Sequence, residues 1–464
     1  MPAKKPLKKK FVKPVPLKEE KPKPSPEEAE NMPKKGVKVI ETLRGFRDVL
    51  PEEQAYWDII RDRARSFAEY YSFSKIELPL LEYEELFNRS VGKATDIVEK
   101  EMYTFEDKSG ARVALRPEAT AQIARAYVNH GMLNRPQPVK FFYLGPMFRH
   151  DRPQAGRYRQ FHQFGFESIG EADPIVDAQL IVIASRFFRD LDIPAIVEVN
   201  SIGTAETRRE YIMELVAYFR QFRSRLSEDD KVRLQKNPLR LLDSKDPTVK
   251  ELLAEAPQIV DWLDEESKAH FMKVLEFLEE VEVPYRLNPF LVRGLDYYNK
   301  TVFELYTSSE SSSTATQGAL AAGGRYDGLV ELLGGREGTP ACGFAVGIER
   351  VVNAMRELNL HPPARFQPKI FFAQLGDSAR RKGLKLYEEF RLAGVPVAEA
   401  FGKGALKAQL EMANKQEAAI TLILGQKEVL DGTIIIRDME SGAQEIVDAN
   451  KVVSMVKKRL GLTE

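Results

Sequence analysis

Residues Phe148 to Glu167 read FRHDRPQAGRYRQFHQFGFE and carry four arginines, Arg149, Arg152, Arg157 and Arg159, around a Pro-Gln-Ala-Gly turn. The segments on either side of the turn alternate as β-strands do. Arginine suits phosphate binding because its planar guanidinium donates two parallel hydrogen bonds and keeps its charge. The stretch therefore predicts a β-hairpin able to hold a polyphosphate, although a plain surface hairpin with solvated arginines fits the same letters.

Four more segments favour the phosphate-binding interpretation. They are LRPEAT at Leu115 to Thr120, LVRGLDYYN at Leu291 to Asn299, AAGGRYDGLVELLGG at Ala321 to Gly335, and GFAVGIER at Gly343 to Arg350. One such motif alone would be weak evidence. Five motifs in one chain are a specific pattern.

Together these segments resemble the histidine–tRNA ligases (histidyl-tRNA synthetases), which are class II aminoacyl-tRNA synthetases. The arginine hairpin resembles the second motif of that class and GFAVGIER the third, while the RGLDYY and GGRYDG segments resemble signatures of the histidine enzymes. LRPEAT resembles their LRPEGT segment, with Ala119 where the family has glycine. If the backbone there needs a positive φ, alanine would be strained. The resemblance runs from about Arg44 to the C-terminus.

The resemblance implies that the chain activates histidine with ATP and passes the histidyl group to tRNA(His). In activation a carboxylate attacks the α-phosphorus, so the site must supply fixed positive charge. Arg149 would hold the α-phosphate, Arg350 the far end of the triphosphate, and Arg293 would bridge the histidine carboxylate and the α-phosphate. Arg149 and Arg293 are thus the expected catalytic residues, and Arg157 is a further candidate for ATP. A surface ion pair is the alternative for any one of them.

The histidine pocket implied by the resemblance needs a carboxylate for the α-ammonium group and polar partners for the imidazole. Glu118 and Thr120 would hold the ammonium group, and Gln163 would add a hydrogen bond nearby. Four other residues would face or close around the ring: Glu167, Tyr297, Tyr298 and Tyr326. Taken singly, Glu118 could instead cap a helix and Tyr298 could pack against a strand.

Other partners follow from the same resemblance. ATP is expected as a substrate with Mg²⁺ held mainly by its phosphates, and tRNA(His) is expected to present its acceptor end to Arg152 and Gln154 in the hairpin loop. The segment from Pro51 to about Glu82 resembles the first class motif, which implies a homodimer. Five histidines and one cysteine show no metal-ligand spacing, so no resident metal is expected.

The length of 464 residues exceeds what one hydrophobic core normally serves. We expect a disordered tail over residues 1–36, which hold eleven lysines, five glutamates and eight prolines. Residues 37–360 are expected to form an α+β catalytic domain on an antiparallel sheet of the class II synthetase type, with a helical insertion at 204–285. A linker at 361–367 would lead to a C-terminal α/β domain at 368–464, where the family has its anticodon-binding domain.

Composition narrows the class of protein. Apolar residues make up 43% and charged residues 30%, as in soluble globular proteins. The chain has no apolar run long enough to span a membrane and no secretory signal, and its one cysteine, Cys342, fits a reducing cytosol. Two other functions share the catalytic core. They are the regulatory subunit of ATP phosphoribosyltransferase and an RNA-binding sensor with a dead site, and both are expected to lose arginines that this chain keeps.

Overall fold

The structure is a computed structural model that describes residues 39–92, 95–151, 156–308, 318–363, 368–402 and 404–462. The predicted N-terminal tail lies outside these ranges, as do Arg152 and Gln154. Among the described residues, no helix is both long and apolar enough to cross a lipid bilayer.

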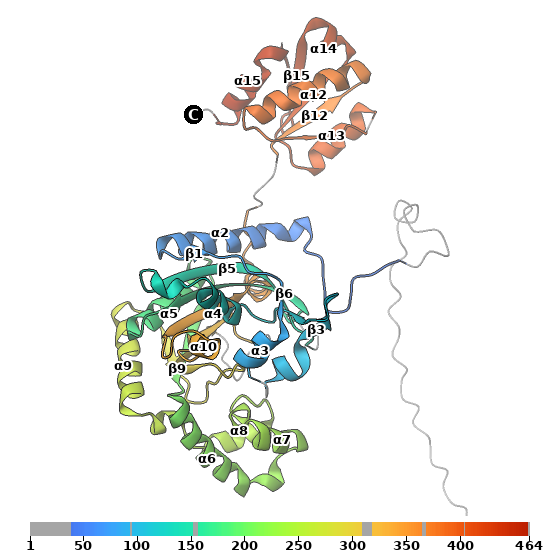
Figure 1. Cartoon of the computed structure of the whole chain (residues 1–464). Coiled ribbons are helices and arrows are strands. Elements are labelled where there is room, and N and C mark those ends of the chain that lie inside the picture. The colour runs from blue at the N-terminus through green and yellow to red at the C-terminus, as the bar shows by residue number, and fades with distance from the viewer. Residues whose placement is uncertain are drawn as a thin grey trace, which may run out of the picture.

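An eight-stranded sheet forms the centre of the larger part of the chain (Figure 1). Its strand order is β1-β5-β6-β11-β10-β9-β7-β8. In that order the strands span Ser74–Lys75, Val139–Phe148, Gln160–Ile169, Ala341–Gly347, Ala321–Arg325, Asn299–Thr307, Ala195–Ser201 and Tyr285–Leu287. Neighbouring strands are antiparallel except at the two edges, where β1 runs parallel to β5 and β8 parallel to β7. The α+β fold expected from the sequence is confirmed, with a sheet that is mixed at its edges.

Strands β5 and β6 form the hairpin expected from the arginine-rich stretch, and Phe148 pairs with Gln160 next to the turn. Side chains alternate along each strand. Phe142, Phe164 and Phe166 therefore point to one face of the sheet and join the larger hydrophobic core. Residues between them, such as Tyr143, belong to the cluster on the other face. This alternation separates a helix-covered face from a face that is left for the functional site.

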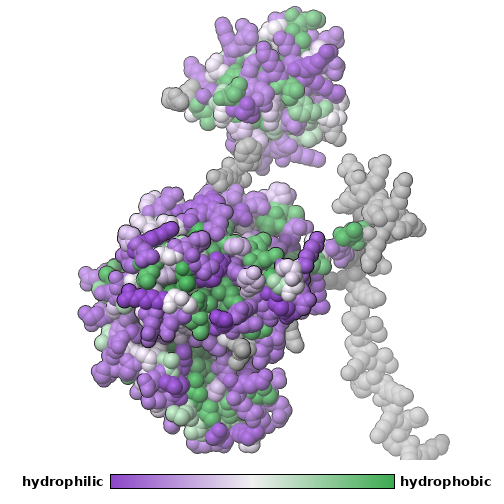
Figure 2. Space-filling view, viewed as in Figure 1, coloured by the Kyte–Doolittle hydropathy of each residue, from purple (hydrophilic) through white to green (hydrophobic). Residues whose placement is uncertain are grey.

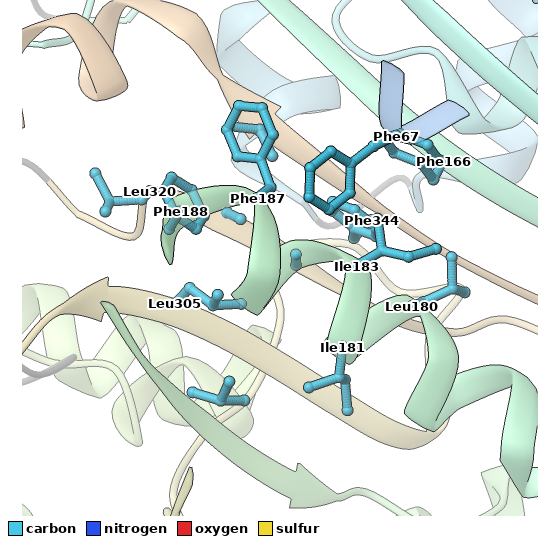
Figure 3. Close-up of a cluster of buried hydrophobic side chains, with 14 of the residues drawn as sticks. Phe67, Phe166, Leu180, Ile181, Ile183, Phe187, Phe188, Leu305, Leu320 and Phe344 are labelled. Atoms are coloured by element: carbon cyan, nitrogen blue, oxygen red, sulfur yellow. The ribbon is translucent and has the colours of Figure 1, made fainter. Parts of the chain in front are cut away.

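Helices α2 (Gln54–Tyr70), α5 (Pro174–Arg189) and α11 (Ile348–Glu357) cover the first face (Figures 1 and 3). Helix α5 begins where Asp173 accepts a hydrogen bond from the Ile175 N–H, and Pro174 occupies its first turn. Its buried phenylalanines and isoleucines pack against the sheet, where the rings of Phe166 and Phe344 stack 5.3 Å apart. These contacts fix β6 against β11, the two strands that carry the second and third motifs.

The segment between β7 and β8 is helical and returns to the sheet through its last helix. Helix α9 packs against α5, β7 and β9. The helical segment between β7 and β8 consists of α6 (Ala205–Gln221), η4 (Arg223–Arg225), α7 (Glu228–Lys236), η5 (Pro238–Leu241), α8 (Pro247–Leu253), η6 (Ile259–Trp262) and α9 (Glu265–Glu280). The core of this helical segment includes Tyr211, whose hydroxyl donates a hydrogen bond to the carbonyl of Pro257.

A second, three-stranded sheet of order β2-β4-β3 lies beside α3 (Glu84–Ser90) and precedes α4 (Thr120–Asn129). Its strands span Leu81–Tyr83, Arg112–Leu115 and Tyr103–Glu106, in that spatial order. The remaining short elements of this part of the chain are η1 (Pro51–Glu53), η2 (Ile97–Glu101), η3 (Met132–Asn134) and α10 (Leu329–Leu332).

The C-terminal part forms a separate five-stranded sheet of order β13-β12-β14-β15-β16. These strands span Val397–Glu399, Ile370–Gln374, Ile420–Leu424, Thr433–Asp438 and Gln444–Asp448, and the first three are mutually parallel. The helices are α12 (Asp377–Leu392), α13 (Leu406–Lys415), α14 (Gln426–Asp431), η7 (Ala449–Lys451) and α15 (Val452–Arg459). The expected α/β fold of this region is confirmed, and its surface in view is largely hydrophilic (Figure 2).

Candidate active site

A cavity of about 830 Å³ opens on the face of the large sheet that α2, α5 and α11 leave uncovered. Its wall includes most of the residues expected from the motifs. These are Glu118, Thr120, Arg149, Arg157, Gln163, Arg293, Tyr297, Tyr298 and Arg350. The helical segment supplies another part of the wall, including Arg240, Asp243 and Lys245. Segments far apart in the chain therefore meet at one place.

Arg149 enters the cavity from the end of β5. Its backbone N–H donates to Arg159 across the hairpin (2.9 Å), and its Nε donates to the carbonyl of Pro117 (2.9 Å). The guanidinium carbon lies 5.4 Å from the centre of the Phe161 ring. Backbone, carbonyl and ring together hold the arginine in a fixed direction, which is what electrostatic stabilisation of a reacting phosphate requires.

Arg350 occupies the first turn of α11 and donates from Nη1 to the carbonyl of Ala319 (2.6 Å). Burial, together with the nearby positive charges of Arg157 and Arg149, lowers the pKa of Arg350 to about 10. The direction of this change shows that several guanidinium groups crowd one poorly solvated region. Such a group is stabilised when an anion binds among its members.

Arg293 lies between β8 and β9 and pairs through Nη1 with Oε1 of Glu304 on β9. Its guanidinium carbon lies 5.4 Å from the centre of the Tyr298 ring. Both members of the pair are mostly buried, with 15% and 14% of the side-chain surface exposed. A carboxylate and an aromatic face thus define where this arginine sits.

Glu118 caps the start of α4. Its carboxylate accepts hydrogen bonds from the backbone N–H groups of Thr120 (2.6 Å) and Ala121 (3.1 Å). Burial raises its pKa above the ordinary glutamate value, against the opposing effect of these N–H groups. Glu118 therefore fills both roles considered for it, because it caps a helix and also lines the cavity.

Ala119 is not strained. Its φ is −111°, in the right-handed helical region that any residue adopts, and its side chain is fully buried. The condition under which alanine would be strained is therefore not met, because the turn does not use a positive φ.

Glu167 lies in the layer directly behind the cavity wall. It is buried, and it accepts hydrogen bonds from Oγ1 of Thr120 (2.8 Å) and from the hydroxyl of Tyr326 (2.5 Å). Burial raises its pKa to about 8, so the carboxyl is protonated at neutral pH. Neither Glu167 nor Tyr326 is among the described residues that line the cavity. Their expected contact with a substrate ring stays a prediction.

Strand register explains a glycine of the third motif. Gly343 on β11 pairs with Glu167 on β6, and a Cβ at Gly343 would lie 1.5 Å from Oε2 of Glu167. Only glycine leaves room for this carboxyl group. The rings of Tyr297, Tyr298 and Tyr326 then pack against one another with centres 4.7 to 6.4 Å apart, and the three form one aromatic cluster.

Sequence reasoning missed several residues that shape the site. Arg325, which directly precedes Tyr326, is fully buried. It donates hydrogen bonds to both carboxylate oxygens of Asp177 on α5. Glu349 accepts hydrogen bonds from the backbone N–H of His162 (2.9 Å) and from Nδ1 of the same residue (2.9 Å). Charged letters inside motifs were the available signal, but they do not say which charges face the cavity.

Comparisons with known proteins give the family of the chain. A family model described as histidyl-tRNA synthetase matches residues 45–351, and one described as an anticodon binding domain matches residues 369–459. A curated histidine–tRNA ligase from Dehalococcoides mccartyi is 44% identical over 91% of this chain and 100% of its own length. The chain belongs to the histidyl-tRNA synthetase family.

Solved structures show the same fold in other members of the family. Apo histidyl-tRNA synthetase from Staphylococcus aureus is similar with a TM-score of 0.74 and 33% identity, over 90% of this chain and 99% of that one. A Bacillus halodurans protein titled ATP phosphoribosyltransferase regulatory subunit/histidyl-tRNA synthetase has a TM-score of 0.58 and 23% identity, over 82% and 97%. At that identity the second likeness concerns the fold alone. The regulatory-subunit alternative is not favoured, because the curated relative over most of the chain is a ligase.

Proposed function

We propose that this chain activates L-histidine with ATP and transfers the histidyl group to the 3′ end of tRNA(His). The observation that carries the proposal is the meeting of Arg149, Arg293 and Arg350 in one cavity whose wall also holds Glu118. A cluster of cations beside a carboxylate suits a substrate that has a polyphosphate at one end and an ammonium group at the other.

In the proposed activation step, a carboxylate oxygen of histidine attacks the α-phosphorus of ATP. The bond from that phosphorus to the bridging oxygen breaks, and pyrophosphate leaves. Arg149 and Arg293 would neutralise charge on the α-phosphate and align the nucleophile, and Arg350 and Arg157 would hold the leaving pyrophosphate. No proton transfer is needed, since the attacking carboxylate is already ionised. Positioning and charge therefore supply the catalysis.

We place the histidine α-ammonium group beside Glu118, Thr120 and Gln163, with the imidazole toward the aromatic cluster that Tyr297, Tyr298 and Tyr326 form. Thr120 links the two regions because its hydroxyl donates to Glu167. A pocket whose polar groups require a partner rejects substrates that lack one by roughly 10⁴–10⁵. We therefore expect strict selection of histidine without a separate editing site.

Mg²⁺ is proposed to enter with ATP. The described residues contain no group of three or more His, Cys, Asp or Glu side chains close enough to hold a metal ion. That arrangement fits a cation bound mainly through phosphate oxygens, with one or two carboxylates of the wall as additional ligands.

We further propose a division of labour along the chain. Residues 37–360 would carry activation, with 204–285 as an insertion. Residues 361–367 would link this part to an anticodon-reading domain at 368–464, which the match of an anticodon binding domain to residues 369–459 supports. The acceptor end of the tRNA is expected near Arg152 and Gln154. A cytosolic location follows from this role in protein synthesis.

We propose that the protein is a homodimer, and that the three-stranded sheet contributes to the interface. Strand register puts six apolar side chains on one face of that sheet, and three of them are 43 to 63% exposed. The six are Leu81, Tyr83, Tyr103, Phe105, Val113 and Leu115. An exposed apolar face of this kind is typical of an interaction surface, and its first strand continues the segment that resembles the dimer-forming motif. Light scattering should give the mass of a dimer.

Exchange of pyrophosphate into ATP tests the proposed function directly. Purified protein is assayed with each of the common amino acids in turn, and exchange is expected with histidine alone. In the Arg149→Ala variant the rate should fall at least about tenfold, because a charge-assisted hydrogen bond is worth roughly 1.5–3 kcal/mol. Exchange with no amino acid would overturn the proposal and favour a regulatory or sensor role.

A further inference from the structure

The carboxylate of Glu304 is the feature of the cavity that the proposed chemistry leaves unexplained. A negative charge beside the arginines should weaken phosphate binding, yet Glu304 lines the same cavity as Arg293. It lies in the middle of β9, between Phe303 and Leu305, which are both fully buried. Its backbone is thus fixed by the sheet, and its side chain has little freedom.

Both carboxylate oxygens of Glu304 have partners. Oε1 accepts from Nη1 of Arg293, and Oε2 accepts from the hydroxyl of Tyr306, two residues along the same strand. Tyr306 is itself buried, with 4% of its surface exposed. The tyrosine therefore orients the carboxylate, and the carboxylate orients the arginine.

Arg293 depends on this hold more than the other arginines of the cavity do. Arg149 and Arg350 each donate to a backbone carbonyl, of Pro117 and Ala319 respectively. Among the described residues, Arg293 donates from its guanidinium to the carboxylate of Glu304, and its Nε is buried without a hydrogen-bond partner. The ring of Tyr298 lies 5.4 Å from the guanidinium carbon and restrains the group from one face, but it supplies no negative charge.

We propose that Glu304 is a positioning residue that holds Arg293 in the direction required for activation. A guanidinium has five N–H donors. Glu304 engages one terminal nitrogen and leaves the other terminal nitrogen for the substrate carboxylate and the α-phosphate. The inference rests on the proposed function, since it assigns Glu304 a role in that reaction. Tyr306 contributes by orienting the carboxylate of Glu304 through its hydrogen bond.

The effect should appear in kcat more than in KM. Arg293 would interact most strongly with the charge that develops on the α-phosphate, so misdirecting it removes stabilisation of the transition state and little binding of the ground state. We expect Glu304→Ala to lower kcat of histidine-dependent pyrophosphate exchange about ten- to hundredfold. Glu304→Gln keeps an acceptor oxygen for Arg293 and should lose clearly less.

A matched control comes from Glu82, which pairs with Arg125 at 2.6 Å and is similarly buried, with 12% of its side chain exposed. It is not among the described residues of the cavity wall. Glu82→Ala should leave kcat near the wild-type value. A loss in Glu82→Ala as large as that in Glu304→Ala would overturn the proposal, because it would show a general effect of breaking an ion pair.

The double variant gives the decisive comparison. If Glu304 acts through Arg293, Glu304→Ala should cost little further activity in an Arg293→Ala background, whereas independent effects would multiply. Wild-type kcat in folded Glu304→Ala, or multiplying losses in the double variant, would overturn the inference. Absence of histidine-dependent exchange in the wild-type protein would instead overturn the proposed function, so the two failures are distinguishable.

Discussion

The large sheet and the C-terminal sheet differ in where they hold charge. Around the large sheet, charged side chains are buried, among them Arg116, Glu118, Asp177 and Arg325. In the described residues from 368 to 462, the buried polar side chains are Gln374, Gln409 and Thr421, which carry no charge. Burying charge is costly unless it is paired or used. The contrast indicates that chemistry belongs to the first region and surface recognition to the second.

Removing the C-terminal region should give the largest effect on the complete reaction. The hydrophobic clusters of residues 370–460 include no residue of the catalytic part, so a chain that ends at Pro363 should keep its catalytic core. We expect this shortened chain to retain histidine-dependent pyrophosphate exchange and to lose most charging of tRNA(His). Filter assays of charged tRNA and exchange assays on the same preparation measure both.

Undiminished charging by the shortened chain would break the comparison, because it would assign tRNA recognition to the catalytic part alone. Loss of exchange together with charging would show that the two regions are not independent. The full-length protein is the reference for both assays.

The second prediction concerns the cost of buried charge. Asp177→Ala removes the fully buried carboxylate that pairs with Arg325 and leaves only the more exposed partner Asp327, and breaking a buried pair in this way costs about 3–5 kcal/mol. Burial alone would raise the pKa of Asp177, but Arg325 and His270 outweigh it and lower the pKa. The free energy of unfolding in urea should fall accordingly. Fluorescence reports on this region because Trp57 and Trp262 both lie in it.

The control for Asp177→Ala is Arg65→Ala, which breaks an exposed pair with Asp62 on α2. Its cost should not exceed about 1 kcal/mol. Equal losses in the two variants would mean that buried charge contributes nothing special to this region, and the contrast between the two sheets would lose its meaning.

Much of this architecture could be predicted from the sequence, because strong local patterns set it. The strand expected before the arginine turn is β5, from Val139 to Phe148, since alternation and a neighbouring turn leave few alternatives. The segment from Lys75 to Glu82 reads KIELPLLE, which alternates like one strand, but the structure does not contain one. It divides into β1 and β2 around Pro79, which has no N–H for a ladder and whose carbonyl accepts from Gln122.

Only those site residues that lie in a local sequence motif could be predicted. Arg149, Arg293 and Arg350 each lie in a motif that can be read locally. The burial of Glu167 behind the cavity wall depends on the register of β6 against β11. The pairing of Glu304 with Arg293 depends on the course of the chain between β8 and β9. The parallel edges of the sheet also escaped prediction, because β1 and β8 are too short to show a pattern. Such features depend on tertiary contacts between distant segments.

The buried carboxyl of Glu167 can be tested through the pH dependence of stability, where the expected change over one pH unit is smaller than the losses above. Its pKa is raised from 4.5 to about 8 in the folded protein. A group with a raised folded pKa contributes stability that is fully present below the unfolded pKa and is lost as pH rises through the folded pKa. Stability of the wild-type protein should therefore decline between about pH 4.5 and 8, with a slope from this group of at most about 1.4 kcal/mol per pH unit.

Glu167→Gln removes this titration while keeping the shape of the neutral carboxyl. Relative to wild type, the variant should gain stability as the pH of urea unfolding rises from 6 to about 8, and the difference should level off by about pH 9. The control Glu69→Gln alters an exposed carboxylate on α2 and should show no such trend. A constant difference between Glu167→Gln and wild type across this range would mean that Glu167 is already ionised in the folded state. Glu167 would then be a further buried charge beside the large sheet, better solvated than its burial indicates, and the contrast with the uncharged interior of the C-terminal sheet would become sharper.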